Sequence, residues 1–289
     1  MRTLGRVIIA LVITGVIAGS VTAGLIAWYR YTKAPLPLVD QCVARVQERD
    51  VGLDIEQTRN ASIIVGVATQ RDLAPRASTI ALTTAYQESG IRNLDHGDRD
   101  SLGLFQQRPS QGWGTPEEIM NPYYSAGAFY DVLVTVPDWD TGDINDVAQT
   151  VQRSGFPDAY AKHVENARRM ASALTGQTPA SFSCVVRNPP AGDPAGLEQF
   201  LQRTLPEEVA VSRGSSSVTI EAPDNRTAWS AAHIALAQVG YYGVNGVTIG
   251  ERSWTHSSTE VARWQGTETN ATTVEVSFDA APAPDTTPS

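Results

Sequence analysis

The chain has 289 residues, of which 42% are hydrophobic, so it is long enough to bury one or two cores. Its 22 Lys and Arg residues against 31 Asp and Glu residues give a formal net charge of -9, which argues against general nucleic-acid binding. Only two cysteines occur, which excludes a disulfide-dense small scaffold and a zinc site made of four thiolates.

The N-terminal segment differs in composition from the rest of the chain. Residues 7–27 carry no charged side chain. The length of this run is close to the number of apolar residues, about 20, that a helix needs to cross a bilayer. The sequence WYR at positions 28–30 follows, as is typical of a membrane interface. A signal peptide cleaved near Ala23 is the alternative, but apolar residues continue beyond that point. We therefore expect an uncleaved transmembrane helix in residues 1–33, with residues 7–29 contacting the membrane and the body outside the cytoplasm.

Two cysteines and a proline-rich segment divide the body. Cys42 and Cys184 lie at the two ends of one segment, so in an oxidising compartment they should form a disulfide; two separate buried thiols are the alternative. Residues 187–195 are rich in Pro and Gly and are the predicted linker. The pattern therefore predicts a first domain over 34–186, a second over 196–278 and a disordered tail over 279–289.

The first domain has mainly helical periodicity. Pro75 and Gly90 mark the start and the end of one helix, and Pro122 should interrupt another. The predicted helices are 58–72, 75–90, 116–136, 144–154 and 159–174, and residues 102–107 form a short strand. We expect a mainly α domain with a small β element.

The second domain has a mixed pattern. A short helix over 196–205 precedes a hairpin over 209–220, and Asp224 or Asn225 caps a helix that continues through Val239. Residues 247–255 and 273–278 alternate like strands. These segments predict a small α+β domain.

Glu88 is the main candidate for chemistry. It lies in the last turn of the helix over 75–90, on the same face as Ala77, Ile80, Ala81 and Thr84. An apolar wall and the negative end of the helix dipole both favour the protonated form of a carboxyl group. Such an acid suits the protonation of a glycosidic leaving oxygen. An ordinary surface glutamate at a helix end is the alternative.

Two short motifs add to this interpretation. The sequences QESG at 87–90 and SLGLFQ at 101–106 resemble the signature of soluble lytic transglycosylases and their goose-type lysozyme relatives. Asn121-Pro122, followed by GAFY at 127–130, resembles the next block of that superfamily, whereas 149–160 departs from its late-helix sequence. The resemblance covers residues 60–174.

The resemblance implies a lysozyme-like fold that cleaves the glycan strands of peptidoglycan without a cofactor. Glu88 would be the general acid at the bond between N-acetylmuramic acid and N-acetylglucosamine. In a lytic transglycosylase the same group then acts as base toward the sugar's own hydroxyl, whereas a lysozyme-type glycosidase needs a base that activates water. The candidates for that base are Asp95, Asp98 and Asp100, which otherwise form a solvated acidic turn.

Further residues near the two motifs are candidates for substrate binding. The resemblance selects Gln106 rather than Gln107 for contact with sugar hydroxyls or with Glu88, because only one of the pair can face the site. Trp113 and Tyr124 could stack on sugar rings or pack in the core, and Ser101 would orient the loop.

Two functional classes remain open from the sequence. The first is an anchored enzyme that cleaves peptidoglycan, and the second is a non-catalytic wall-binding or assembly module with the same fold. The four histidines have no metal-ligand spacing, so we expect no metal site. The sequence indicates no protein partner for the second domain.

Overall fold

A computed structural model describes residues 39–153, 158–267 and 270–279. They form a mixed α+β structure with one three-stranded and one five-stranded antiparallel sheet. The predicted anchor in 1–33 and nearly all of the predicted tail lie outside the described residues. No helix within the described ranges is both long enough and apolar enough to cross a membrane.

The small sheet joins two distant parts of the chain. Its strands are β1 (Gln41–Val46), β2 (Arg49–Asp54) and β3 (Phe182–Val185), in the order β2-β1-β3. Cys42 and Cys184 are directly opposite each other on β1 and β3, and a disulfide links them. The predicted disulfide is therefore confirmed.

The helices of the first half follow the predicted pattern with local differences. They are α2 (Ile55–Gln70), α3 (Pro75–Ser89), α4 (Pro116–Ile119), α5 (Pro122–Leu133), α6 (Ile144–Gln152) and α7 (Val164–Leu174). Helix α2 begins before the predicted residue 58, because Asp54 and Gln57 form a capping box at its start. The predicted end of α3 at Gly90 and the predicted break at Pro122 are confirmed.

The second half carries the larger sheet. Its elements are α8 (Pro194–Thr204), β4 (Ala210–Arg213), β5 (Ser217–Glu221), α9 (Asn225–Leu236), α10 (Val239–Tyr242), β6 (Val244–Ile249), β7 (Arg252–Thr255) and β8 (Thr273–Phe278). The strand order is β4-β5-β8-β6-β7. The prediction of one strand over 247–255 is wrong, because the chain reverses at Gly250, where φ is positive, and forms the hairpin of β6 and β7. The helix predicted through Val239 ends at Leu236, and α10 follows separately.

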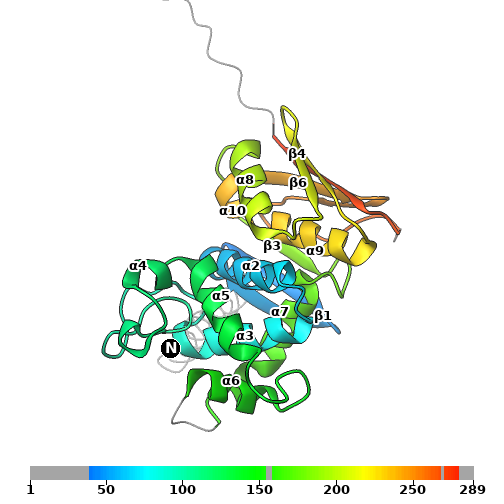
Figure 1. Ribbon diagram of the computed structural model, residues 1–289. Helices are drawn as coiled ribbons and strands as arrows, with labels where there is room; N and C mark the ends of the chain where they lie inside the picture. The colour runs from blue at the N-terminus through cyan, green and yellow to red at the C-terminus, as the bar shows by residue number, and fades with distance from the viewer. Residues whose placement is uncertain (1–38, 154–157, 268–269, 280–289) are drawn as a thin grey trace, which may run out of the picture. The chain divides into compact units, whose positions relative to one another are not determined.

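The described residues of the two halves pack into one compact unit. Helix α8 contacts α2, and α9 contacts both α7 and β3, so these helices lie between the larger sheet and the first half (Figure 1). Gly66 on α2 permits the close approach of α8, since a Cβ atom there would lie 2.6 Å from the backbone oxygen of Thr204. The predicted linker over 187–195 ends inside α8, which starts at Pro194 after the cap Asp193.

The first half has α2 and α3 at its centre. Most residues of both helices are buried, including the stripe Ala77, Ile80, Ala81 and Thr84 of α3. Helix α3 contacts α2, α5, α6 and α7. This packing places its C-terminal turn, which carries Glu88, at the edge of the core.

Candidate active site

Glu88 is half-buried in the last turn of α3 and is held by a buried tyrosine. The hydroxyl of Tyr160 donates a hydrogen bond of 2.6 Å to Oε1 of Glu88. Tyr160 is only 1% exposed, so its ring has little freedom to move. It precedes the 3-10 helix η2 (Ala161–His163), which leads directly into α7. Two segments 72 positions apart in the sequence therefore meet at this carboxyl group.

The residue after Glu88 connects the two sequence motifs. The hydroxyl of Ser89 donates a hydrogen bond of 2.7 Å to the carbonyl oxygen of Leu104. It also accepts a hydrogen bond of 3.2 Å from the backbone N–H of Arg92. The end of α3 is thus fastened to the turn over 101–107, so the structure brings the QESG and SLGLFQ segments together.

The segment predicted as a strand is instead a tight turn with two isolated bridges. Leu102 pairs with Gln107, and Gly103 pairs with Leu94. Gln106 has φ 48°, a conformation that does not continue a strand. The turn nevertheless places the carbonyl oxygen of Leu104 against α3.

Hydrophobic packing fixes this turn from the other side. Leu104 and Phe105 are both 0% exposed, and Phe105 stacks on Phe129 of α5 with ring centroids 4.6 Å apart. The side-chain amide of Gln152 donates a hydrogen bond of 2.7 Å to the carbonyl oxygen of Phe105. The turn beside Glu88 is therefore anchored to α5 and α6.

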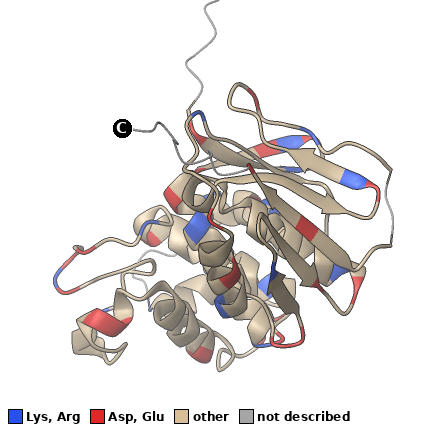
Figure 2. Cartoon of the chain, turned by 90° about the horizontal axis from the view of Figure 1, so that it is seen from above, with Lys and Arg blue, Asp and Glu red and all other residues tan. Residues whose placement is uncertain are grey.

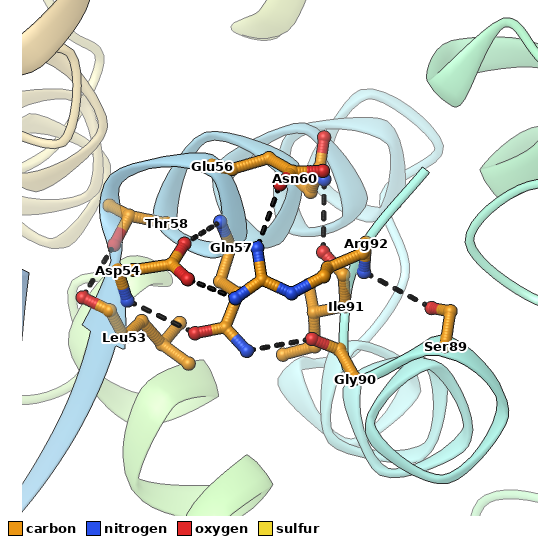
Figure 3. Close-up of polar contacts among 10 residues, drawn as sticks. All are labelled: Leu53, Asp54, Glu56, Gln57, Thr58, Asn60, Ser89, Gly90, Ile91 and Arg92. Carbon is orange, nitrogen blue, oxygen red and sulfur yellow. Dashed lines mark hydrogen bonds and ion pairs between the residues drawn. The ribbon is translucent and has the colours of Figure 1, made fainter. Parts of the chain in front are cut away.

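The chain after Glu88 is held by α2 through two side-chain amides (Figure 3). Gln57 donates to the carbonyl oxygen of Gly90 at 2.8 Å, and Asn60 donates to the carbonyl oxygen of Ile91 at 2.9 Å. Gly90 and Ile91 have φ values of 65° and 60°. A β-branched residue strongly disfavours this left-handed region, so the surrounding contacts must compensate for Ile91.

Charged groups complete the attachment of this turn to α2. Arg92 forms ion pairs with Asp54 and with Glu56, the latter at 2.7 Å, as Figure 3 shows. Asp54 is also the N-cap of α2 and accepts a hydrogen bond of 2.9 Å from the backbone N–H of Gln57. The same residues therefore start α2 and fix the chain that leaves Glu88.

The two glutamines at the end of the motif have different environments. Gln107 is 1% exposed and donates a hydrogen bond of 3.0 Å to the carbonyl oxygen of Ser125 in the core. Gln106 is partly exposed, and its side-chain amide donates to the carbonyl oxygen of His96 at 3.2 Å. Of the pair, only Gln106 has a side chain that solvent can reach directly.

The remaining candidates for substrate binding lie around the same loop. Ser101 is buried, and its backbone N–H donates a hydrogen bond of 3.1 Å to the carbonyl oxygen of Asp98. Tyr124 is 37% exposed, and its ring lies against Gly114, where an added Cβ atom would be 2.7 Å from the phenolic oxygen. The neighbouring Trp113 is partly buried and packs on the core. Of these two aromatic residues, Tyr124 is therefore the more exposed.

The three acidic candidates for a second carboxylate have their own partners. Asp100 accepts hydrogen bonds from Arg108 at 2.9 Å and from the backbone N–H of Ser110 at 2.8 Å, and these bonds hold its pKa well below the usual value. Asp95 binds the ring of His96, whose hydrogen bond also lowers the pKa of Asp95. Asp98 has a side chain that is 92% exposed. The contacts of Asp100 serve to shape the loop.

Two further side chains beside Glu88 are not identified by the sequence patterns. His163 stacks on Tyr86 with centroids 5.4 Å apart, and its Nε2 lies 3.3 Å from Oε1 of Gln87. Burial lowers the pKa of His163 and raises that of Tyr86 to about 12. Tyr160 lies at the end of residues 149–160, where the sequence differs from that of lytic transglycosylases, so no motif indicated its contact with Glu88.

Comparisons with known proteins add no relative. No protein-family model matches this chain, and no curated protein matches it. Within the described ranges, no three His, Cys, Asp or Glu side chains lie close enough together to hold a metal ion.

Proposed function

We propose that this chain is a membrane-anchored, extracytoplasmic enzyme that cleaves peptidoglycan between N-acetylmuramic acid and N-acetylglucosamine. Its first half would be a lysozyme-like domain in which Glu88 is the general acid and base. The observation that carries the proposal is the 2.6 Å hydrogen bond from the buried Tyr160 to the half-buried Glu88. General acid–base catalysis needs a carboxyl group held within reach of the reacting oxygen, and the bond from Tyr160 holds Glu88 in one orientation.

The proposed reaction uses one carboxyl group in two successive steps. Glu88 first donates its proton to the glycosidic oxygen while the bond from that oxygen to the sugar carbon breaks. The substrate's acetamido group can stabilise the cationic centre. The Glu88 carboxylate then accepts a proton from the hydroxyl of the same sugar, whose oxygen attacks the cationic carbon and forms an anhydro product. Tyr160 orients the carboxyl group in both steps through Oε1.

Two of the three aspartates have hydrogen-bond partners of their own, which favours this route over hydrolysis, and the exposed Asp98 is the candidate for a hydrolytic base. Asp100 is occupied by Arg108 and Ser110, and Asp95 by His96. A hydrolase would need a carboxylate that positions a water molecule at the sugar. We therefore propose a lytic transglycosylase, with a lysozyme-type hydrolase as the alternative.

Substrate contacts are assigned to exposed groups of the loop that follows α3 and of α5. The amide of Gln106 can donate to or accept from sugar hydroxyls, and the exposed ring of Tyr124 can cover the apolar face of a sugar. Ser101 would act by shaping the loop, because its side chain is buried. Trp113 would stack on a sugar only through its exposed part.

Two features support the proposed location of the protein. The disulfide between Cys42 and Cys184 favours an oxidising compartment, where such bonds persist. The uncharged sequence at 7–27 favours attachment to the membrane. Together they support a single-pass protein of the cell membrane whose body faces the glycan strands.

Digestion of purified peptidoglycan by the full-length chain tests the proposal. We expect anhydro-ended fragments, identified by mass spectrometry. Products with reducing ends would instead support hydrolysis. Binding of the glycan without any cleavage would support the wall-binding module. The variants Asp95→Asn, Asp98→Asn and Asp100→Asn should retain cleavage, and loss of cleavage in one of them without loss of folding would identify a second carboxylate.

A further inference from the structure

A cavity at the opposite end of α3 from Glu88 is lined by arginines. Its volume is about 370 Å³, which is within the size range of small-molecule sites. Arg76 of α3 and both Arg168 and Arg169 of α7 contribute to its lining. Arg76 lies twelve residues before Glu88 on α3, so at about 1.5 Å per residue roughly 18 Å of helix separates them. The cavity is thus separate from the candidate active site.

The charge of this cavity is opposite to that of the chain as a whole. Among the described residues that line it, three are arginines and Glu165 is the only acidic one, so the lining has an excess of two positive charges. The whole chain has a formal net charge of -9, and Figure 2 shows Asp and Glu residues on both halves of the described structure. A local excess of positive charge in an acidic protein indicates a site for an anion.

The arginines of α7 have N–H groups that their contacts with Glu165 do not fully use. Glu165 bridges the two arginines of α7, with Oε1 3.3 Å from Arg168 and Oε2 3.4 Å from Arg169. These distances are longer than those of a strong charge-assisted hydrogen bond. The side chain of Arg169 is only 12% exposed. Within the described residues, its Nε is buried without any hydrogen-bond partner. A buried N–H donor of this kind is costly unless a ligand or water accepts its hydrogen bond.

The start of α3 adds to the positive potential. Pro75 and Arg76, in the first turn, line the cavity, and this helix end has neither a side-chain cap nor an acidic residue in that turn. The N-terminus of a helix carries a partial positive charge that favours anions. Arg76 itself is held in place by bonds to the carbonyl oxygens of Trp139 and Gly142.

We propose that this cavity binds a phosphomonoester. Such a group carries a charge of about -1.5 to -2 at neutral pH, which matches the two excess positive charges of the lining. Its oxygens can accept paired hydrogen bonds from guanidinium groups. Glu165 then competes with the ligand, because its carboxylate binds two of the same arginines, Arg168 and Arg169.

Calorimetric titration of the full-length chain with glycerol 3-phosphate at low ionic strength tests this site. We expect saturable binding, which Arg169→Gln should weaken by about tenfold or more through the loss of a charge-assisted hydrogen bond. Arg168→Gln, at a more exposed position, should weaken it less. Glu165→Gln should strengthen binding, because it removes the competing carboxylate. This increase in affinity is not expected if Glu165 and the arginines serve only to stabilise α7.

Arg213→Gln is a matched control. Arg213 forms a 3.0 Å ion pair with Glu198 in the second half of the chain, so this variant makes the same charge change away from the cavity. It should bind glycerol 3-phosphate like the wild type, and circular dichroism should verify that every variant is folded. Absence of saturable binding to the wild type, or equal affinities of folded Arg169→Gln and wild-type chains, would overturn the proposal. Equal or tighter binding of the diester glycerophosphoglycerol would overturn the assignment to a monoester.

Discussion

The hydroxyl of Tyr160 donates a 2.6 Å hydrogen bond to Oε1 of Glu88, and the tyrosine ring is almost completely buried. The donor belongs to the segment before α7, whereas the acceptor lies in the last turn of α3, so the contact depends on the packing of these two helices. A buried donor of this kind limits the directions that the carboxyl group can take. The proposed acid is therefore positioned before any substrate binds.

The variant Tyr160→Phe tests that positioning. It removes one hydroxyl and keeps the ring, so the fold should survive, while glycan cleavage should fall about tenfold through loss of the hydrogen bond that orients the carboxyl group. The measurement is the rate of peptidoglycan digestion. Tyr123→Phe is the control, because it removes a hydroxyl that bonds to Thr204, away from Glu88, and should leave the rate unchanged. Equal rates for Tyr160→Phe and the wild type would refute a positioning role.

The contact between Asn60 and the chain after Glu88 gives a second prediction. Asn60→Ala leaves the carbonyl oxygen of Ile91 without its 2.9 Å hydrogen bond, so the free energy of unfolding should fall by about 1–3 kcal/mol. The rate of glycan cleavage should fall as well, because Ile91 lies three residues after Glu88. Urea unfolding and digestion assays measure the two effects.

A control separates the local effect of Asn60 from general loss of stability. Tyr130→Phe removes a buried 2.9 Å hydrogen bond to the carbonyl oxygen of Ile64, in the core between α2 and α5. This variant should lose stability but keep its cleavage rate under folding conditions. If both variants lose activity in proportion to their stability, the Asn60 contact has no specific role in the site.

The disulfide should account for a large part of the stability. Replacing both Cys42 and Cys184 by Ala opens a loop with a sequence separation of 142 residues. The chain-entropy treatment of such a loop gives a loss of about 4–5 kcal/mol in the free energy of unfolding. Urea unfolding of the double variant should show this loss, and dithiothreitol should shift the wild type but not the variant. The prediction would be contradicted if the urea midpoint were the same for the wild type and the double variant, each with and without dithiothreitol.

The buried His233 predicts a pH dependence of stability. Burial lowers its pKa from 6.5 to about 4 in the folded protein, although the carbonyl oxygen of Ala173 lies 2.7 Å from Nδ1. As pH falls, the unfolded chain therefore takes up this proton first. The contribution to stability is complete above pH 6.5 and is lost as pH falls to about 4. The total loss is up to about 3 kcal/mol.

Two measurements check the behaviour of His233. The ring resonances of the folded protein, followed by nuclear magnetic resonance, should not titrate until the pH is near 4. The free energy of unfolding should also be smaller at about pH 5 than at about pH 7. An ordinary titration of the His233 ring in the folded protein would rule out this explanation.

Local signals in the sequence were sufficient for several elements. Pro75 and Gly90 delimit α3 because proline suits the first helical turn and glycine readily adopts the left-handed conformation at the end. Pro122, preceded by the cap Asn121, separates α4 from α5. The two cysteines at the ends of one segment predicted their pairing correctly.

Other features depend on contacts that no short pattern reveals. The hairpin of β1 and β2 turns at Gln47 and Glu48, which both have positive φ although neither is a typical residue for that conformation. Strand β3 contains only four residues and forms by pairing with β1. The contact of Tyr160 with Glu88 spans 72 positions, and only the packed fold brings them together.

The most direct measurement of the central claim is peptidoglycan digestion by Glu88→Gln. Glutamine has nearly the same volume and can still accept the hydrogen bond from Tyr160, so folding and glycan binding should change little. It cannot donate a proton as an acid, and general acid–base catalysis contributes about 10²–10⁴-fold to the rate. We predict that cleavage falls at least about a hundredfold while the glycan is still bound. Cleavage at the wild-type rate by Glu88→Gln would contradict this prediction.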